Sequence, residues 1–459
     1  MLFIAIDDLN DWLGCMKGHP DTRTPALDRL AGEGVLFTSA HCQAPLCGPS
    51  RASLMTGLRP STTGIYGMIE DDRIRDDNEA TGDIVYLPEY FRDHGYHTMG
   101  IGKLFHTHAP GGVFDESGGR SKGFGPVPEE RFVWDGYGTS DRERYGRTST
   151  DWGAYPEADS LMPDHRSASW TIERLEREYD RPFFLAVGFL RPHVPWYVPE
   201  QWFDLHPADR LEMPPYHPGD LKDLPPLAFQ INDLPMMPST EWAIESGEWP
   251  RIIQAYLACV SFVDHQVGRV LEALRNSAHA ENTVVVLWSD HGYRLGEKGT
   301  FAKHALWEEA TNAPLIVAGP GLAEGKIIHE PVEMLSIYPT LLDLCGLPAY
   351  ERNEGISLAP FLTGEHEPEQ GTAITTFGMN NHTVRTDRFR YICYEDGGEE
   401  LYDRKADPNE WNNLAGDPAY SVIRQQLKDR LPEVNRPWAV HSSYTFQPYF
   451  AEQKERTGR

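Results

Sequence analysis

One stretch decides how the chain is interpreted: Cys47-Gly48-Pro49-Ser50-Arg51, continued by Leu54-Met55-Thr56-Gly57. Pro49 suits the first position of a helix, where no backbone N–H is needed. Cys47 would then lie at a helix N-terminus, where free N–H groups and the helix dipole favour negative charge. Arg51 follows one turn later and can offer a fork of donors to an oxyanion. The pattern predicts an anion-binding nucleophile site, and the alternative is a buried cysteine before an ordinary helix.

Length and composition predict a large globular protein. A chain of 459 residues is too long for one small core, so we expect one large α/β domain with a smaller domain appended. The 20 tyrosines and 12 tryptophans exclude a disordered chain. The net charge of −27 argues against nucleic acid or an anionic membrane as a partner, because both require a basic face. An anionic substrate would therefore need local cations in its pocket.

The cysteines and the start of the chain carry less information. The six cysteines have neither metal-ligand spacing nor the density of a disulfide framework. Leu2–Ile6 already has the pattern of a buried strand, and no signal peptide or membrane-spanning run is visible. The localisation stays open: periplasmic or secreted if an export signal has been removed, and cytoplasmic otherwise.

Acidic residues follow two apolar runs that resemble buried strands. Asp7 and Asp8 come directly after Leu2–Ile6, and Ser289-Asp290-His291 follows Thr283–Trp288. Ligands bind at the carboxyl ends of strands in a parallel sheet. Two carboxylate clusters meeting there predict a site for a hard cation. For Asp7-Asp8 alone, the alternative is a solvated turn.

Basic residues follow two further strand candidates. Lys103 and His106 come after His97–Ile101, where they could steer and protonate an anionic centre; the alternative is a surface lysine and a loop histidine. His193 follows Pro182–Val187, and the prolines on either side restrict its backbone. A histidine held at a strand end suits acid–base chemistry.

The remaining pattern places these residues in an α/β framework. We expect helices from Pro25 to Gly32 or Gly34, from Leu87 to Gly95 and from Ser336 to Leu344, a long amphipathic core helix over Tyr256–Leu274, and strands at Val35–Thr38 and Pro314–Val317. Residues 107–165 are expected to form loops that face the substrate, and residues 196–250 an irregular excursion. Beyond residue 350 the pattern predicts a strand over Val384–Tyr394 and a hairpin turn at Asp396–Gly398.

The motif Cys-x-Pro-Ser-Arg-x-x-Leu-x-Thr-Gly at residues 47–57 resembles the signature of the type I sulfatases. The resemblance implies that a maturing enzyme converts Cys47 to formylglycine, whose hydrated aldehyde is the nucleophile. It also implies an alkaline-phosphatase/sulfatase-like α/β fold, with a large, mostly parallel central sheet flanked by helices. A catalytic domain over residues 1–350 would be followed by a small α+β subdomain with an antiparallel sheet over residues 351–459.

The resemblance assigns a metal site and its ligands. Asp7, Asp8, Asp290, His291 and the modified residue 47 map onto the ligands of one divalent cation. Mostly oxygen ligands point to Ca²⁺ or Mg²⁺. The resemblance favours Ca²⁺, and the single imidazole leaves Mn²⁺ as a further alternative.

The resemblance also assigns catalytic roles. His193, helped by Lys303, would protonate the departing oxygen, and His106 would act as the base that lets sulfate leave residue 47. Lys103 and Arg51 would hold residue 47 and the developing charge. Lys298 and His304 are less favoured alternatives to Lys303.

Three details resemble the iduronate-2-sulfatase-like branch: the two-residue gap between Lys103 and His106, the Pro-His-x-Pro segment at 192–195, and the Asp290-His291 pair. They imply a sulfated sugar as substrate, such as a 2-O-sulfated uronic acid of a glycosaminoglycan or an algal polysaccharide. The alternatives are a choline, alkyl or aryl sulfatase, a phosphate or phosphonate monoester hydrolase, a carbohydrate-binding relative without catalysis, and a hydrolase that uses the Cys47 thiolate directly.

Overall fold

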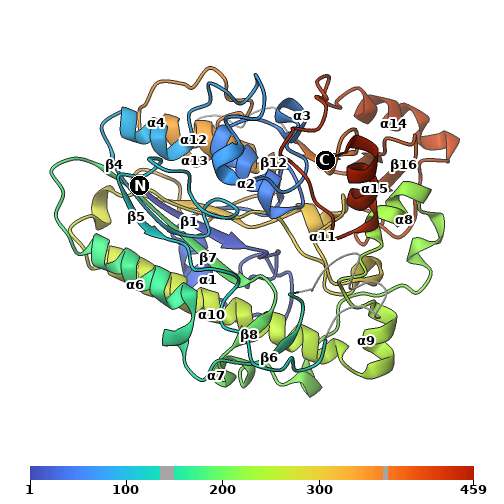
Figure 1. Ribbon diagram of the computed structural model, residues 1–459, viewed down its shortest axis with the longest axis horizontal. Coiled ribbons are helices and arrows are strands. Elements are labelled where there is room, and N and C mark those ends of the chain that lie inside the picture. The colour runs from blue at the N-terminus through green and yellow to red at the C-terminus, as the bar shows by residue number, and fades with distance from the viewer. Residues whose placement is uncertain (135–148, 365–370, 459) are drawn as a thin grey trace.

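The computed structural model describes residues 1–134, 149–364 and 371–458, and its centre is an eight-stranded sheet (Figure 1). In spatial order the strands are β11 (Lys326–Ile328), β2 (Gly34–Phe37), β10 (Leu315–Ala318), β9 (Val285–Ser289), β1 (Leu2–Asp7), β7 (Phe183–Pro192), β4 (His97–Gly102) and β5 (Glu116–Gly119). Strand β10 runs antiparallel to β2 and β9, and the other neighbouring pairs are parallel. The mostly parallel sheet confirms the predicted fold class.

Strand β1 shows that the sheet is buried on both faces. Successive side chains of a strand point to opposite faces. Ile4 and Ile6 pack in one hydrophobic core with α10 (Trp249–Arg275), whereas Phe3 and Ala5 pack in the core on the other side. A strand covered on both faces requires an unbroken apolar run, which the start of the chain supplies.

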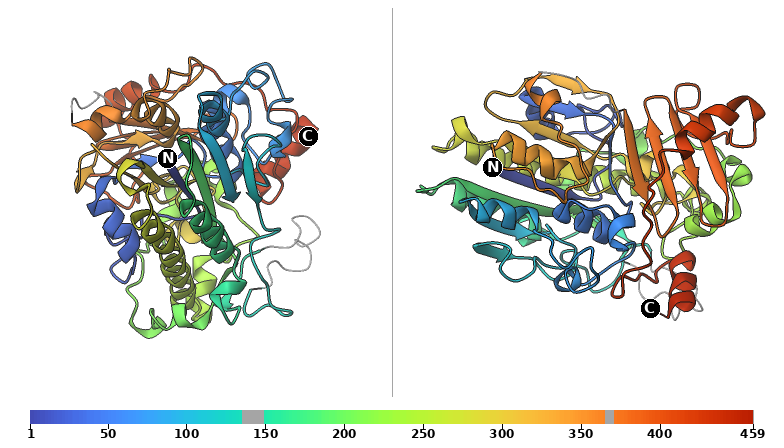
Figure 2. Two further views of the ribbon diagram at one scale, coloured as in Figure 1. Left: turned by 90° about the vertical axis from the view of Figure 1, so that its left-hand side faces the viewer. Right: turned by 90° about the horizontal axis from the view of Figure 1, so that it is seen from above.

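Helices form a layer on each face of the sheet (Figures 1 and 2). One layer consists of α1 (Pro25–Gly32), α6 (Pro163–Leu175) and α10; the other consists of α2 (Cys47–Thr56), α4 (Leu87–Asp93), α12 (Ile337–Leu344) and α13 (Ala359–Thr363). Shorter elements connect them: α3 (Pro60–Thr63), α7 (Glu200–Phe203), α8 (Pro226–Asn232), α9 (Thr240–Ser246), α11 (Glu308–Thr311), and the paired strands β3 (Ala40–His41) with β12 (Val332–Glu333) and β6 (Trp152–Ala154) with β8 (Trp196–Val198). In the part of the chain that the structure describes, no helix is both long and apolar enough to span a membrane.

The C-terminal part forms a second, antiparallel sheet, as predicted. Its strands are β13 (Thr372–Thr376), β14 (His382–Thr386), β15 (Phe389–Cys393) and β16 (Glu399–Asp403), accompanied by α14 (Ser421–Lys428) and α15 (Pro448–Thr457). Viewed from above, this sheet stands beside the central one (Figure 2, right). The division at residue 350 stays a prediction, since α13 lies beyond it and still packs in a core of the central sheet.

Four local predictions are wrong. The segment 196–250, predicted to be irregular, contains β8 and the short helices α7, α8 and α9. Helix α2 begins at Cys47, so Pro49 is its third residue; this is tolerated because the first N–H groups of a helix have no intrahelical acceptor. The strand predicted over Val384–Tyr394 is two strands, since the chain turns at residues 387–388 between β14 and β15. The predicted loop 107–165 contains β5 and β6, whose short sequences lack apolar alternation, and its residues 135–148 lie outside the described part of the chain.

The C-terminal sheet is joined to the central domain by a buried ion network. Arg390, from β15, donates to Glu410 (Nε–Oε1, 2.6 Å) and also to Glu308 at the start of α11. The Trp307 indole N–H donates to Glu400 of β16 (2.8 Å). Burial favours the protonated form of Glu308, but Arg385 and the other neighbouring guanidinium groups hold its pKa well below the ordinary range. The segment that precedes α11 is thereby fixed from the C-terminal side.

Replacing the central arginine of this network should destabilise the protein. We expect Arg390→Met to lower the free energy of unfolding by about 3–5 kcal/mol, because two carboxylates lose a buried partner. Lys405→Met is the matched control: its ion pair with Asp387 is exposed on both sides, so the denaturation midpoint should hardly move. Chemical denaturation of both variants measures this, and equal midpoints would contradict the role of the network.

Candidate active site

The parallel strands bring the predicted residues to one edge of the central sheet. Strands β9, β1, β7 and β4 are consecutive neighbours and run in the same direction. Their carboxyl ends lead to Asp290, Asp8, His193 and Lys103 respectively. Gly102 lets β4 approach β7 there: its φ is +81°, and a Cβ would lie 2.0 Å from the Gly188 carbonyl oxygen.

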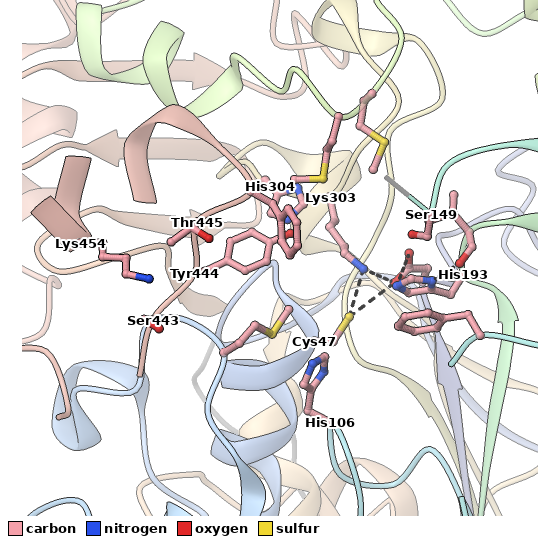
Figure 3. A pocket seen from close by; sticks show the side chains of 17 residues that line it. Cys47, His106, Ser149, His193, Lys303, His304, Ser443, Tyr444, Thr445 and Lys454 are labelled. Atoms are coloured by element: carbon pink, nitrogen blue, oxygen red, sulfur yellow. Dashed lines mark hydrogen bonds and ion pairs between the residues drawn. The ribbon is translucent and has the colours of Figure 1, made fainter. Parts of the chain in front are cut away.

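Cys47 lies at the bottom of a cavity of about 440 Å³, at the first position of α2 (Figure 3). Only 1% of its surface is exposed. The Sγ atom lies 3.0 Å from Lys303 Nζ, 3.3 Å from His291 Nε2 and 3.8 Å from Asp8 Oδ1. Residues from two distant parts of the chain, Asp8 near its start and His291 with Lys303, therefore surround one sulfur atom.

Two fully buried cations lie beneath this sulfur. Arg51 Nε donates to Asp290 Oδ2 (2.8 Å), and its Nη2 donates to Asp7 Oδ1 (3.3 Å). Lys103 Nζ donates to the other oxygen of Asp7. Burial alone would raise the pKa of Asp7, but Lys103 and the other nearby cations hold it well below its usual range. Buried charges are tolerated when they are paired in this way.

Two contacts fix the ring of His193. Its Nδ1 lies 2.5 Å from the Val194 carbonyl oxygen, which fixes the tautomer of the neutral ring with the proton on Nδ1. The ring stacks on Phe124, with centroids 3.9 Å apart and planes 2° apart. Its Nε2 lies 3.9 Å from Asp8 Oδ2. Burial and the charge of Lys303 hold its pKa well below the ordinary value.

Lys303 and His106 also line the cavity. Lys303 Nζ donates to Asp8 Oδ1 (2.6 Å) in addition to its contact with Cys47. His106 lines the cavity near Cys47 (Figure 3), and its buried Nδ1 has no hydrogen-bond partner among the described residues. Burial and Lys103 lower the pKa of His106 to about 3, so the ring is neutral. Four of the six predicted catalytic residues, Cys47, His106, His193 and Lys303, thus line the cavity, whereas Arg51 and Lys103 are fully buried.

The carboxylates and His291 fit a divalent cation. Ligand atoms of Asp7, Cys47, Asp290 and His291 all lie within 4.8 Å of one another, and Asp8 contributes to an overlapping group. Asp8 Oδ2 is buried and has no hydrogen-bond partner in the described part of the chain. Burial opposes protonation of His291, yet Asp290 and the Cys47 sulfur raise its pKa to about 9. The cluster therefore attracts positive charge, and its oxygen-rich donors suit a hard cation.

The alternatives to Lys303 lie in different surroundings. Lys298 pairs with Asp220 (2.6 Å) and donates to the Glu410 carbonyl oxygen, away from the cavity. His304 does line the cavity, where its ring stacks on Tyr444 with centroids 5.6 Å apart.

The walls of the cavity include residues that the sequence did not indicate. From the predicted substrate-facing segment 107–165, the cavity takes Phe124 and Ser149. The other walls come from Met68, Val194, Met236, Met237, Ser443, Tyr444, Thr445, Phe446 and Lys454. The C-terminal residues among them lie almost four hundred positions from Cys47, so no local pattern could have assigned them to the same cavity.

Comparisons with known proteins point to one family. A sequence profile of the sulfatase family matches residues 1–347, and one described as N-sulphoglucosamine sulphohydrolase, C-terminal, matches residues 296–437. A sulfatase of Formosa agariphila is 63% identical over 459 residues, which covers 99% of this chain and 90% of that protein. Iduronate 2-sulfatase of Homo sapiens is 32% identical over 386 residues, or 76% of this chain and 69% of that protein.

Solved structures share the fold. A 2-O GAG sulfatase matches with a TM-score of 0.70 and 25% identity, over 94% of this chain and 90% of that one. A phosphonate monoester hydrolase of Agrobacterium radiobacter matches with a TM-score of 0.73 and 24% identity, over 93% and 94% of the two chains. The fold alone therefore does not separate sulfate esters from phosphonate esters.

A divalent cation should stabilise the protein if the cluster binds it. At about 100 times its Kd, such an ion would raise the free energy of unfolding by about 2.7 kcal/mol. We expect Ca²⁺ added to chelator-treated protein to raise Tm, and Asp290→Asn to abolish the rise. Asp220→Asn, at a buried carboxylate outside the cluster, should keep it. Differential scanning calorimetry measures the shift, and an equal rise in both variants would place the ion elsewhere.

Proposed function

The chain belongs to the type I sulfatase family of sulfuric ester hydrolases, and we propose that it releases sulfate from a sulfated sugar, with residue 47 acting as a formylglycine nucleophile beside a divalent cation. The observation that carries the proposal is the position of Cys47, at a helix N-terminus and at the bottom of a cavity, with Lys303 Nζ 3.0 Å from its Sγ. In the proposed enzyme, oxygens of the hydrated aldehyde occupy the place of this sulfur.

Conversion of Cys47 to formylglycine would have to occur before folding is complete. Because the residue is buried at the bottom of the cavity, a separate enzyme could not reach it in the folded protein. We therefore infer that the maturing enzyme, a partner of this chain, acts before folding is complete.

The negative charge of the sulfate ester is matched by cations on this chain. Lys303 lies next to the nucleophile position, and Arg51 and Lys103 supply positive charge from beneath. Such preorganised charges stabilise the charge that develops during transfer of the sulfuryl group. They also explain how a chain of net charge −27 could bind an anionic substrate.

Asp7, Asp8, Asp290 and His291 would hold the cation together with residue 47. Ca²⁺ fits the oxygen-rich donors best, with Mg²⁺ and Mn²⁺ as alternatives. When bound, it would polarise a sulfate oxygen and lower the pKa of the nucleophile.

His193 is the proposed proton donor to the departing sugar oxygen. Its Nδ1 contact with Val194 leaves Nε2 toward the site, so the ring must first take a proton on Nε2. The charge of a bound sulfate ester would favour that proton by raising the pKa. Lys303 supports the transfer from the other side, and neutral His106 is the proposed base for the release of sulfate.

The proposed substrate is a sulfate monoester of a sugar, such as a 2-O-sulfated uronic acid of a glycosaminoglycan or algal polysaccharide. Support comes from the relatives, which include iduronate 2-sulfatase and a 2-O GAG sulfatase. Choline, alkyl or aryl sulfates and phosphate or phosphonate monoesters are the alternatives.

A thiolate hydrolase is the second candidate mechanism. It would need a histidine beside Cys47, and His291 Nε2 lies 3.3 Å from the sulfur. However, His291 Nε2 also lies 3.4 Å from Asp8 Oδ1 and 3.6 Å from Asp290 Oδ1. An imidazole among carboxylates resembles a metal ligand more than a dedicated base, so we favour the formylglycine mechanism.

The first test of the function is sulfate release by protein co-expressed with a maturing enzyme. The panel contains a 2-sulfated uronate, a 6-sulfated hexosamine, choline sulfate, an aryl sulfate and matching phosphate esters. We expect release from a sugar sulfate and loss of that activity in Cys47→Ala, since the nucleophile is removed. Cys259→Ala is the control, because Cys259 is buried in α10 outside the cavity.

The same samples separate the alternatives. The mass of the Cys47 peptide reports formylglycine directly, and an unmodified thiol in fully active protein would favour the thiolate mechanism. Release of phosphate but not sulfate would show that the protein is a phosphate ester hydrolase instead.

His193→Gln tests the proton donor. We expect kcat for a sugar sulfate to fall by about 10²–10⁴-fold, because an alkoxide leaving group needs a proton. An activated aryl sulfate should be affected far less, since its phenolate leaves unaided. Parallel kcat measurements on the two substrates decide the matter, and an equal fall in both would show that His193 does not protonate the leaving group.

A further inference from the structure

One side of the cavity is formed by a group of residues that the proposed reaction does not use. In Figure 3, Ser443, Tyr444, Thr445 and Lys454 lie on the opposite side of Cys47 from His193 and Ser149. They belong to the segment after the C-terminal sheet and to α15. Next to Tyr444 lies His304, which directly follows Lys303 in the chain.

His304 has two polar atoms and no protein partner for either. The residue is 1% exposed, and neither Nδ1 nor Nε2 has a hydrogen-bond partner within the described ranges. Burying unsatisfied polar atoms is unfavourable, so such a residue in a cavity wall is suited to a ligand. Burial and the charge of Lys303 hold its pKa well below the ordinary value. The neutral ring can donate with one nitrogen and accept with the other, as recognition of a hydroxyl group requires.

Tyr444 stacks on the His304 ring and extends the aromatic part of the cavity wall. The two rings are stacked, with centroids 5.6 Å apart and planes 17° apart. Tyr444 in turn contacts Phe446 and Phe450, which come from the same C-terminal segment. This part of the wall is thus largely aromatic, and His304 adds two polar atoms to it.

Lys454 adds an exposed positive charge to the wall of the cavity. Its neighbours on α15 are engaged: Glu452 accepts from Gln230, and Arg456 pairs with Glu395. No ion pair or hydrogen bond is found for the Lys454 ammonium among the described residues, and its side chain lines the cavity (Figure 3). Lys303, in contrast, is already bonded to Asp8. In a chain of net charge −27, an unpaired lysine beside an anion-binding cavity indicates a second anionic group on the ligand.

We propose that His304, Tyr444 and Lys454 form a second recognition site of the enzyme, in which His304 binds a hydroxyl group of the sulfated sugar and Lys454 binds a second negative charge on the substrate. This inference rests on the proposed function and goes beyond it by assigning residues to substrate selection. The second charge is either a carboxylate, as in a uronic acid, or another sulfate ester. Neutral sugars with a single sulfate are then poorer substrates than dianionic ones.

The test compares kcat/KM for a sulfated uronate, a disulfated hexosamine, the corresponding neutral hexose sulfate and an aryl sulfate. In Lys454→Gln, the preference for dianionic over monoanionic substrates should fall by about fivefold to tenfold, mainly through KM. Lys454→Arg should restore the preference for dianionic substrates. Added salt should reduce the same preference in the wild-type enzyme. Lys17→Gln, at an exposed lysine outside the cavity, controls for the loss of one surface charge. The dianionic substrate whose kcat/KM falls more in Lys454→Gln identifies the group that Lys454 binds.

His304→Phe keeps a ring against Tyr444 and removes both nitrogens. We expect KM for sugar sulfates to rise by about tenfold relative to KM for the aryl sulfate, which has no sugar hydroxyl. Unchanged substrate ratios in both variants would overturn the second site while sulfate release from the panel still supported the sulfatase reaction. Absence of sulfate release from every substrate by formylglycine-containing protein would overturn the proposed function, and the second site with it.

Discussion

The Asp7 carboxylate, which has no exposed surface, accepts hydrogen bonds from Lys103 and Arg51, and the site is built around these contacts. Arg51 extends the same network to Asp290. Removing charges from water is costly unless each finds a partner, so the end of β1, the end of β4 and helix α2 must all be in place together. This requirement fixes Cys47 at the first turn of α2 over the strand ends.

The sheet meets this requirement through its strand order. Strands β9, β1, β7 and β4 lie side by side and point the same way, so the residues that follow them converge without long connections. The carboxylates then lie on the β9 and β1 side, and the proposed proton carrier follows β7. Four neighbouring strands thus hold the proposed metal ligands and the proposed proton carrier in position. Such an arrangement suits a reaction that depends on preorganised charge.

The C-terminal part of the chain holds one segment near the site in place and lines part of the cavity. Its sheet holds the chain near α11 through Arg390 and Glu400, and Lys303 lies only a few residues before that helix. Its last segment also contributes Tyr444 and Lys454 to the cavity wall. In the proposed enzyme, reaction and substrate selection are therefore divided: the central sheet supplies the reacting residues, and the C-terminal segment contributes to substrate recognition.

Much of the framework could be predicted from sequence because its signals are local. The apolar run before Asp7-Asp8 and the run before Asp290 indicate buried parallel strands within a few residues. The errors arise where the local signal is weak. The short strand β5 has a Glu-Ser-Gly-Gly sequence, and the turn between β14 and β15 lies in a continuous alternating pattern.

The sequence by itself determined the sulfatase family, the α/β class and the residues proposed for the reaction, because a fixed spacing around Cys47 and polar residues at strand ends are short-range features. Only the tertiary structure decided which atoms face one another, such as Lys303 Nζ and Cys47 Sγ. It also decided that His304 lacks protein partners and that Lys454 reaches the cavity. These facts depend on packing between segments hundreds of residues apart, for which no local pattern exists.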